Sequence, residues 1–360
     1  MSKAPQGWRG RKVFVTGHTG FKGTWLCHWL HRLGCEIHGF ALSPPSEPNM
    51  FSVTHVPSLL ASDARVDLRD AGAVASAVHT AAPQVVFHLA AQSLVREGYR
   101  DPLDTFATNV SGTANVLEAA RQTPSVRAVV IVTTDKVYEN REWLHPYREA
   151  DPLGGYDPYS ASKAAAEIVT ASYRSSYFGK PDSAQIATAR AGNVIGGGDW
   201  AKDRLIPDCL AAFAAGKPVQ LRYPNSVRPW QHVLEPLSGY IALAEKLLDE
   251  TVTGFDRAWN FGPDAAGDAE VGAVAKLAGK MWGPAADVQF DVTDGQLPHE
   301  AGLLRLDSTL ARVSLHWTPR WNLRTAIEQT IAWQRAWHRG DDMTAVTGAQ
   351  IEAYSAAPAP

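Results

Sequence analysis

Residues 12–33 read KVFVTGHTGFKGTWLCHWLHRL, an apolar run, a turn with three glycines, and an amphipathic run that Gly34 ends. The pattern predicts a strand over 12–15, a turn over 17–23 and a helix over 24–33. Glycines allow the backbone to approach a pyrophosphate, whose charge the free amides and the positive helix end can bind. The stretch therefore predicts a dinucleotide site, with a tight turn that binds nothing as the alternative.

Short apolar runs and helical stretches continue to alternate through the first half of the chain. Further strands are predicted at 36–42, 65–68, 85–89 and 126–132, and long helices at 104–121 and 159–178. This alternation is typical of a parallel sheet with helices on both faces, and the nearly continuous apolar run 84–91 fits a strand buried on both sides. We expect an α/β fold with a Rossmann-type, doubly wound parallel sheet.

The alternation ends after Arg190, where three consecutive glycines and several proline-bounded pieces follow. The change predicts a smaller, mixed α/β lobe that binds substrate, which suits a chain too long for one core. The expected division is 1–190 for the NAD-binding domain, with segments near 230–262 returning to it, 191–229 and 263–340 for the substrate lobe, and 341–360 for a loose tail. The tail ends in Ala and Pro and offers little that could pack.

The composition is that of an ordinary globular protein, with 360 residues, 45% of them hydrophobic and 20% charged. A net charge of -3 provides no field for nucleic acid or an anionic membrane, so a small-molecule substrate is expected. The sequence shows no signal peptide and no run long enough to cross a bilayer, which predicts a cytoplasmic protein. Cys27, Cys35 and Cys209 lack disulfide or zinc spacing and are expected to be buried, and no metal site is expected.

The cofactor expected in the glycine turn is NAD. An acidic residue about 20 positions after the turn would bind the adenosine ribose, but Ala41-Leu42-Ser43 stands there. No Arg or Lys is present in that stretch for the 2′-phosphate of NADP either. Asp67 is either a contact of the adenine amino group or a solvated loop carboxylate. The expected cofactor contacts are Gly17, His18, Gly20, Phe21, Gly23, Ser43, Asp67, Leu68, Leu89, Ala90, Ala91, Asn109, Tyr159 and Lys163.

Two short segments carry the residue types of a proton-transfer site. Tyr159 and Lys163 are four positions apart in a helical run, so they share a face and the Lys can lower the pKa of the phenol. Thr134 follows an apolar strand, at the carboxyl end where open α/β sheets bind ligands. Asp135 and Lys136 come next, and alone they would be an ordinary turn carboxylate and a surface amine. Hydride transfer needs only the Tyr and Lys, so the added pair indicates a nicotinamide-dependent dehydratase.

Together these segments resemble the nucleotide-sugar 4,6-dehydratases of the extended short-chain dehydrogenase/reductase family. The similarity runs over nearly the whole chain. It is carried by Thr16-Gly-His-Thr-Gly-Phe-Lys-Gly23, His88-Leu-Ala-Ala-Gln92, Thr133-Thr-Asp-Lys136, Gly155-Tyr-Asp-Pro-Tyr159, Arg190-Ala-Gly-Asn-Val-Ile-Gly-Gly-Gly-Asp-Trp200 and Arg228-Pro-Trp-Gln-His232. The similar dTDP-glucose enzymes have Asp-Glu in place of Asp135-Lys136, and 4-epimerases lack the acid pair. With residues 196–200, this points to the branch that acts on CDP-glucose.

The resemblance implies a reaction in three steps. Tyr159 takes the proton of the C4 hydroxyl while a hydride passes to NAD. Asp135 then acts as general acid toward the departing C6 hydroxyl while the C5 proton is removed. Lys136 is either the base for this proton or a charge that stabilises the enolate. The hydride finally returns to C6, which gives CDP-4-keto-6-deoxy-D-glucose and leaves the cofactor unchanged.

The resemblance also implies the substrate contacts and the assembly. An Arg fork suits the diphosphate, although Arg228 could also form a structural ion pair. Two long helices, 104–121 and 159–178, are expected to build a four-helix interface in a homodimer or homotetramer. The pathway implied is deoxysugar synthesis for a surface polysaccharide such as the lipopolysaccharide O-antigen. The expected substrate contacts are Gln92, Ser93, Thr134, Asn193, Arg204, Leu205, Arg228, Asn260 and His299.

Three other interpretations remain open at this point. A nucleotide-sugar 4-epimerase on the same fold would need Tyr159 and Lys163 but would have no use for Asp135. A 4,6-dehydratase for another nucleotide-glucose would have the same motifs, because no spacing rule identifies cytosine. A cofactor-binding sensor without catalysis would turn over no sugar nucleotide, and the intact catalytic residues argue against it.

Overall fold

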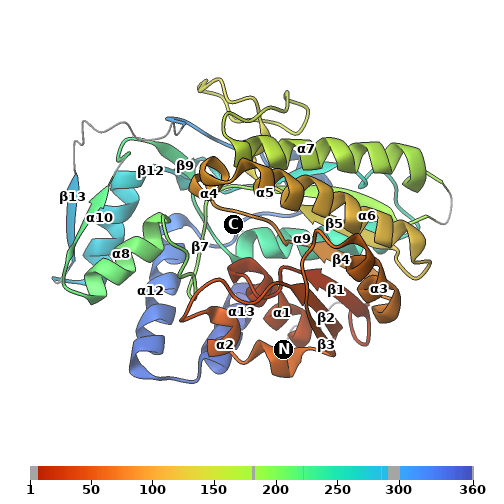
Figure 1. Cartoon of the computed structure of the whole chain (residues 1–360). Coiled ribbons are helices and arrows are strands. Elements are labelled where there is room, and N and C mark those ends of the chain that lie inside the picture. Colours follow the sequence, from red (N-terminus) through yellow and green to blue (C-terminus); the bar gives the residue numbers. More distant parts are fainter. Residues whose placement is uncertain (1–6, 181–182, 222, 285, 291–300, 359–360) are drawn as a thin grey trace.

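A seven-stranded parallel sheet forms the centre of the computed structural model, which describes residues 7–180, 183–221, 223–284, 286–290 and 301–358 (Figure 1). The strand order is β11-β6-β5-β4-β1-β2-β3, and all neighbours run parallel. The strands are β1 (Lys12–Thr16), β2 (Glu36–Ala41), β3 (Ser62–Arg65), β4 (Val85–His88), β5 (Ala128–Val132), β6 (Gln185–Ala191) and β11 (Ala258–Phe261). The predicted fold class is confirmed.

Helices cover both faces of this sheet (Figure 1). One face carries α3 (Ala71–Ala81), α6 (Gly112–Gln122) and α7 (Pro158–Tyr173), and the other carries α1 (Phe21–Arg32) and α9 (Leu234–Leu248). Successive residues of a strand point to opposite faces, so Phe14 packs in one core cluster while Val13 and Val15 pack in the other. This double burial explains the continuous apolar runs of the sequence.

The long helical stretches next to the site each contain a wider turn. Residues 102–122 comprise α5 (Pro102–Phe106), the π-turn η2 (Ala107–Ser111) and α6, preceded by α4 (Val95–Arg100). Helix α7 continues into a second π-turn, η4 (Arg174–Phe178). Such turns occur frequently at functional sites. The first contains Asn109, whose Oδ1 accepts from the Gln92 backbone N–H at 2.9 Å and so fixes the loop after β4.

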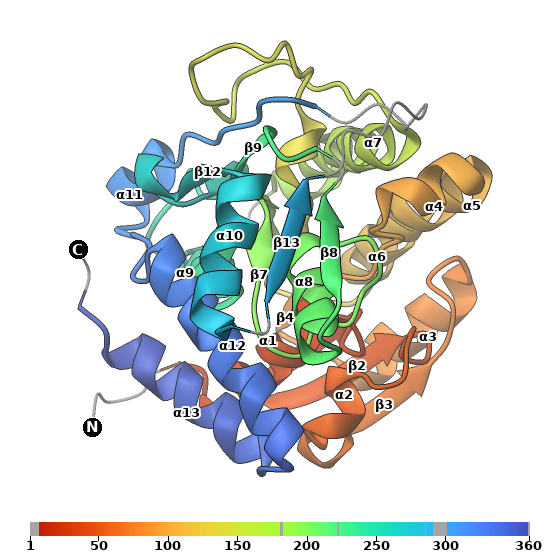
Figure 2. The same cartoon turned by 90° about the vertical axis from the view of Figure 1, so that its left-hand side faces the viewer.

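A smaller lobe with its own apolar core stands beside the carboxyl ends of the strands (Figure 2). In it β8 and β13 run parallel, β9 and β12 run antiparallel, and β7 and β10 run parallel. Its elements are β7 (Val194–Ile195), α8 (Leu205–Ala214), β8 (Pro218–Leu221), β9 (Val227–Pro229), β10 (Gln231–His232), η5 (Ala265–Gly267), β12 (Asp268–Glu270), α10 (Val271–Trp282) and β13 (Asp287–Phe290). Phe213, Trp230 and Val274 lie in its core.

The remaining elements close the structure around these two parts. They are α2 (Met50–Val53), η1 (Val56–Leu59), η3 (Asp135–Val137), α11 (Thr309–Ser314), α12 (Leu323–Arg339) and α13 (Met343–Ala356). Helix α12 contributes Trp333 to the large core and Ile327 to the small one, so it joins the lobes. No helix of the described residues has the length and apolarity needed to cross a membrane. All three cysteines are buried, as predicted.

The expectation of a loose tail at 341–360 is wrong, because most of that segment forms α13. Asp342 caps the helix by accepting from the Thr344 and Ala345 backbone N–H groups. Ile351 and Tyr354 are buried, and the Tyr354 hydroxyl donates to Glu235 of α9 at 2.6 Å. Apolar residues at helical spacing thus supply a packed face despite the terminal Ala and Pro.

Strand β3 ends at Arg65, whereas the sequence predicted a strand over 65–68. Asp70 accepts from the Ala73 backbone N–H and caps α3, so the chain must turn before it. Leu68 is buried beside Gly112 of α6, where its side chain fills the space that a Cβ would occupy. The apolar character of this segment therefore reflects packing of a loop rather than a strand.

Candidate active site

A cleft of about 500 Å³ lies between the carboxyl edge of the sheet and the smaller lobe. From the large domain it is lined by Lys22, Thr134, Asp135, Lys136 and Tyr159. From the smaller lobe and its connections it is lined by Asn193, Arg204, Leu205, Leu221 and Arg228. Charged groups from both parts of the chain therefore meet in one cavity, as expected for a small-molecule site.

The glycine turn fits a bound pyrophosphate. Gly17 has φ +74°, and a Cβ there would lie 2.6 Å from the Ala90 nitrogen. A Cβ on Gly23 would lie 2.1 Å from the Gly17 carbonyl oxygen. Helix α1 begins at Phe21 with Gly20 as its N-cap and no side-chain cap. The amides at its start are therefore not covered by a capping side chain, so the helix end suits the phosphates of a dinucleotide.

The expected ribose end of this site lies at Leu42 and Ser43, both exposed after β2. The structure brings Arg65 to this place, where its Nη1 donates to the Leu42 carbonyl oxygen at 3.4 Å. The same guanidinium donates to both oxygens of Asp63, at 2.7 and 2.8 Å. His18 is fully buried and its Nε2 lies 2.8 Å from Asp63 Oδ1. An Arg side chain that already donates to both oxygens of a carboxylate has few hydrogen-bond donors left for a 2′-phosphate.

Thr134 and Asp135 stand where β5 ends and the short helix η3 begins. The Thr134 hydroxyl donates to Asp135 Oδ1 at 2.9 Å. Asp135 is 2% exposed, and burial raises the pKa of its carboxyl group against the opposing effects of Lys136, Thr134 and Arg228. Among the described residues its second oxygen, Oδ2, has no hydrogen-bond partner. The carboxyl group lines the cleft and has one buried oxygen whose hydrogen-bonding capacity the described residues leave unused.

Tyr159 and Lys163 occupy the first turns of α7, which Asp157 caps by accepting from the Ser160 backbone N–H. Burial raises the pKa of Tyr159 to about 12, and an interaction with Thr134 is the largest effect that opposes the rise. The Lys163 ammonium donates to the Val132 carbonyl oxygen at 3.1 Å, and burial lowers its pKa to about 8. In this structure Thr134 and Arg204 both lower the pKa of Tyr159 against the effect of burial, and the expected contribution of Lys163 stays a prediction.

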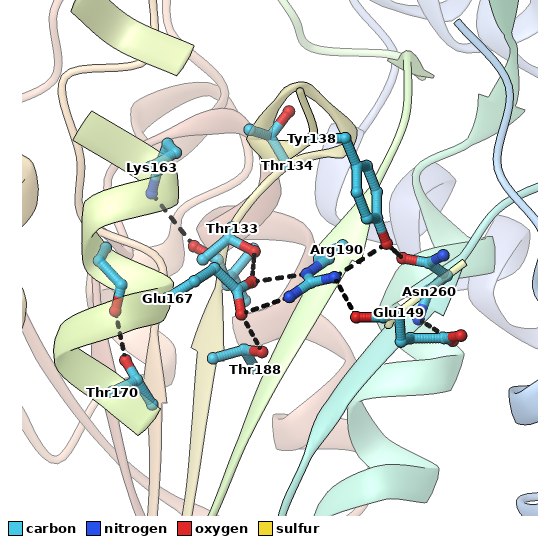
Figure 3. Close-up of polar contacts among 12 residues, drawn as sticks. Thr133, Thr134, Tyr138, Glu149, Lys163, Glu167, Thr170, Thr188, Arg190 and Asn260 are labelled. Carbon is cyan, nitrogen blue, oxygen red and sulfur yellow. Dashed lines mark hydrogen bonds and ion pairs between the residues drawn. The ribbon is translucent and has the colours of Figure 1, made fainter. Parts of the chain in front are cut away.

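A buried polar network locks α7 against the strands that carry the site (Figure 3). Glu167 lies one turn after Lys163 and forms an ion pair with Arg190 of β6, with both side chains 4% exposed. Its two oxygens also accept from Thr133 at 2.5 Å and from Thr188 at 2.6 Å. Arg190 further donates to the Tyr138 hydroxyl at 2.9 Å. The network fixes the distance between the β5 end and the helix that bears Tyr159.

Most of the predicted substrate contacts line the cleft, but two do not. Asn260 is fully buried, accepts from the Tyr138 hydroxyl and donates to the Tyr147 and Asp307 carbonyl oxygens, so its role is structural. Gln92 is likewise occupied, since its amide donates to Thr105 and accepts from the Leu94 backbone N–H. His299 lies outside the described residues. The predicted residues that line the cleft are Ser93, Thr134, Asn193, Arg204, Leu205 and Arg228.

The basic residues of the cleft are held by the protein itself. Arg204 donates to Asp199 at 3.1 Å and to the Ser93 hydroxyl at 3.4 Å. Arg228 is 2% exposed and donates to the Val227 and Ala301 carbonyl oxygens. Both guanidinium groups line the cleft, where an anionic diphosphate would meet two fixed positive charges.

The other predicted cofactor residues take different places. Asp67 is held by Arg69 at 2.5 Å in the loop after β3, the arrangement of a loop carboxylate. Asn109 uses its amide group to connect the Gln92 backbone to Ser162 of α7. Leu89 and Ala90 accompany the turn, since their backbone N–H groups donate to Thr16 Oγ1 at 3.1 Å. Leu89 and Ala90 thus hold the end of β4 beside the glycine turn through their backbone N–H groups.

Three functional candidates were missed from the sequence. Lys22, inside the glycine turn, lines the cleft, and burial lowers its pKa to about 8, with Arg204 contributing. The sequence did offer a signal for Lys22. A charged residue stands between two glycines of the fingerprint, at a position where an apolar residue would suit the helix core. Arg190 begins one of the quoted motifs but was given no role, and Glu167 gave no local signal, because their pairing depends on the register of α7 against β6. The described residues contain no group of His, Cys, Asp and Glu suited to a metal ion.

Comparison with known proteins gives consistent results. The model of the GDP-mannose 4,6-dehydratase family matches residues 14–330. A CDP-glucose 4,6-dehydratase of Salmonella typhimurium is 45% identical over 357 residues, which is 97% of this chain and 98% of the relative. A dTDP-glucose 4,6-dehydratase of Streptomyces griseus is 29% identical, over 70% of this chain and 73% of the relative.

Solved structures share the fold at lower identity. A double mutant of DesIV, a dTDP-glucose 4,6-dehydratase from Streptomyces venezuelae with NAD and DAU bound, superposes with a TM-score of 0.77 at 22% identity, covering 92% of this chain and 98% of that one. A UDP-glucose 4-epimerase of Thermotoga maritima with UDP-glucose gives a TM-score of 0.76 at 20% identity, covering 91% of this chain and 99% of that one.

Proposed function

The chain belongs to the GDP-mannose 4,6-dehydratase family of nucleotide-sugar dehydratases, and from this premise we propose that it converts CDP-D-glucose to CDP-4-keto-6-deoxy-D-glucose and water. The base preference is supported by the 45% identity to the CDP-glucose enzyme over nearly the whole chain. The dehydration is supported by the site itself.

The observation that carries the proposal is Asp135 in the cleft beside Tyr159. An epimerase needs only a base for the C4 hydroxyl, whereas loss of the C6 hydroxyl needs a proton donor. Burial raises the pKa of Asp135, which favours the protonated acid, and its Oδ2 has no partner among the described residues. The group is therefore prepared to donate a proton to a ligand oxygen.

The proposed cofactor is NAD, which takes the C4 hydride and returns it to C6 when bound. The glycine turn and the uncapped start of α1 would hold its pyrophosphate. The occupation of Arg65 by Asp63 supports NAD over NADP. Lys163, whose ammonium donates to the Val132 carbonyl oxygen at the end of β5, would bind the ribose next to the nicotinamide.

The chain's own residues have separate parts in the proposed reaction. Tyr159 takes the C4 hydroxyl proton, and Asp135 protonates the leaving C6 hydroxyl. Lys136 lines the same cleft, as the C5 base or as a charge that stabilises the enolate. Arg204 and Arg228 would hold the diphosphate. The enclosing smaller lobe would limit the access of water to the intermediate.

We further propose a homo-oligomer paired through the two predicted long helical stretches, which the structure forms over 102–122 (α5, η2 and α6) and 158–178 (α7 and η4). Leu103 is 80% exposed, Ile168 60% and Tyr177 50%, and all lie in these helical stretches. Apolar side chains exposed along neighbouring helices are typical of an interface. Light scattering after gel filtration tests this, with a monomer at micromolar concentration as the contradicting result.

The function is tested by incubating the protein and NAD separately with CDP-glucose, dTDP-glucose, GDP-mannose and UDP-glucose. Mass spectrometry then follows any product lighter by one water. We expect this loss from CDP-glucose alone. Epimerised UDP-glucose without water loss would establish the epimerase instead, and no turnover of any substrate would favour a sensor.

A further inference from the structure

Residues 196–200, Gly-Gly-Gly-Asp-Trp, lie in the loop between β7 and α8 and pack against three helices of the chain. A Cβ on Gly197 would lie 2.1 Å from Trp333 Cγ of α12, and the Trp25 indole N–H of α1 donates to the Gly197 carbonyl oxygen at 3.0 Å. Gly198 has φ +79°, and a Cβ there would lie 2.7 Å from Met50 Cγ of α2. Glycine at both positions therefore lets the loop lie this close to the three helices.

This packing fixes the two residues that follow the glycines. The Trp200 ring lies with its centroid 5.7 Å from that of Trp333 and 5.1 Å from that of Trp337. The side chain of Asp199 is only 6% exposed, and its Oδ1 accepts from the Ala201 backbone N–H at 3.0 Å. The Asp199 carboxylate therefore has a fixed position beside the cleft, in the turn that leads to α8.

The second oxygen of Asp199 holds Arg204, the N-cap residue of α8. Asp199 Oδ2 accepts from Arg204 Nη1 at 3.1 Å, and Arg204 Nη2 donates to the Ser93 hydroxyl at 3.4 Å. Ser93 lies in the loop after β4 of the large domain, so the guanidinium joins two sides of the cleft. The ion pair between Arg96 and Asp203, at 3.0 Å, joins the same two segments. Arg204 is therefore held between two parts of the chain that face each other.

We propose that Asp199 is a positioning residue that holds the Arg204 guanidinium where it meets the diphosphate of the substrate. This inference rests on the proposed function. The Arg204 side chain is 34% exposed, and an Arg held by nothing would sample many rotamers, so ordering it when the ligand binds would lower the affinity. Asp199 removes this cost in advance. A guanidinium has five N–H donors, so two contacts with the described residues leave others for phosphate oxygens.

The Asp199 carboxylate also has an electrostatic effect of the opposite sign. Its negative charge repels a phosphate, so a carboxylate that only neutralised Arg204 would weaken the binding of a diphosphate. Positioning and neutralisation therefore predict opposite changes in affinity when the carboxylate is removed. The burial of Asp199 and its contact with the Ala201 backbone favour positioning, because they fix the group that holds Arg204.

The test is a double-mutant cycle on nucleotide binding, which needs no turnover. Calorimetry measures the Kd of CDP, with NAD present, for the wild type, Asp199→Asn, Arg204→Ala and the double variant. An Asn amide has one acceptor oxygen and cannot accept from both Ala201 N–H and Arg204 in the way that a carboxylate does. We expect Asp199→Asn to weaken CDP binding about three- to tenfold and Arg204→Ala about 10–100-fold. In the Arg204→Ala background, Asp199→Asn should change the Kd by less than about twofold.

Two further measurements separate positioning from a general structural role. With CDP-glucose, Asp199→Asn should raise KM by the same factor as the Kd while kcat stays within about twofold of the wild type. Arg204→Lys changes a half-exposed side chain, keeps its charge and loses its planar fork, so it should weaken CDP binding about three- to tenfold. Asp341→Asn, which breaks an exposed pair with Arg339 at the end of α12, is the matched control and should bind CDP as the wild type does.

Unchanged or tighter CDP binding in Asp199→Asn would overturn the proposal, and so would an effect that adds fully to that of Arg204→Ala. If Asp199→Asn does not fold, unchanged affinity in Arg204→Lys would still overturn it. A wild type that dehydrates no sugar nucleotide would refute the proposed function, and the CDP cycle would still judge the coupling of Asp199 with Arg204. If the protein binds UDP rather than CDP, the same cycle with UDP provides that judgement.

Discussion

Replacing Glu167 by Gln tests how the catalytic strand and α7 are held together. The carboxylate is 4% exposed and accepts hydrogen bonds from Arg190 Nε and Nη2, both at 3.0 Å, and from two threonine hydroxyls. A Gln keeps the shape but leaves the Arg190 guanidinium without a countercharge. Removing one partner of a buried ion pair costs about 3–5 kcal/mol.

This loss of unfolding free energy corresponds to a lower melting temperature. An unfolding entropy of about 2.1 cal/mol/K per residue gives about 760 cal/mol/K for 360 residues. The Glu167→Gln variant should therefore melt about 4–7 °C below the wild type in scanning calorimetry at pH 7. Glu118→Gln, which breaks an exposed pair with Arg121 on α6, is the matched control and should melt with the wild type.

The ion pair between Glu167 and Arg190 also makes the stability of the protein depend on pH. Burial by itself would raise the pKa of Glu167, but Arg190 and the threonine hydroxyls hold it below its usual value of 4.5. Its stabilising effect is therefore present above about pH 4.5 and is lost as the pH falls through the folded value. The difference between wild type and Glu167→Gln should shrink in acid. A melting shift of less than about 1 °C at pH 7 would refute the reasoning.

Three further predictions concern other parts of the molecule. Asp135→Asn should retain C4 oxidation while water loss slows about 10²–10⁴-fold, so that quenched reactions contain CDP-4-keto-glucose; normal dehydration would remove Asp135 from the mechanism. Gly23→Ala places a Cβ 2.1 Å from the Gly17 carbonyl oxygen and should weaken NAD binding at least about tenfold in calorimetry; unchanged affinity would place the cofactor elsewhere. Burial raises the pKa of Glu235 from 4.5 to about 7, so the folded state holds a proton that the unfolded chain has released. The stability of the wild type relative to Glu235→Gln, from urea unfolding, should fall by about 3 kcal/mol as the pH rises from about 4.5 to 7, and a flat difference would contradict the raised pKa.

The sequence predicted those features that depend on neighbours in the chain. The glycine turn is determined by local backbone geometry, and the parallel sheet by continuous apolar runs. Thr134 and Asp135 could be placed at a strand end because carboxyl ends of parallel strands share one edge. Tyr159 and Lys163 share a helix face through their spacing alone. The structure brings all four residues into or beside one cleft, as these rules require.

The features that the sequence did not reveal depend on contacts between distant segments. Glu167 and Arg190 pair across α7 and β6, and a shift of one residue in β6 would point Arg190 to the other face of the sheet. Asn260 has the polar side chain of a ligand contact, but its burial beneath Tyr138 is set by the order of the strands. The expectation of a loose tail rested on the Ala and Pro residues at the end of the chain. The helical spacing of Ile351 and Tyr354 instead indicates a packed helix face.

The transfer of hydride within one sugar is the centre of this account, and deuterium can follow it directly. CDP-glucose labelled with deuterium at C4 would be converted by the purified protein with unlabelled NAD, and the product examined by mass spectrometry and NMR. We predict CDP-4-keto-6-deoxy-D-glucose with the deuterium in the C6 methyl group. A dehydrated product without deuterium at C6, or a 4-epimer that keeps the label at C4, would contradict the mechanism.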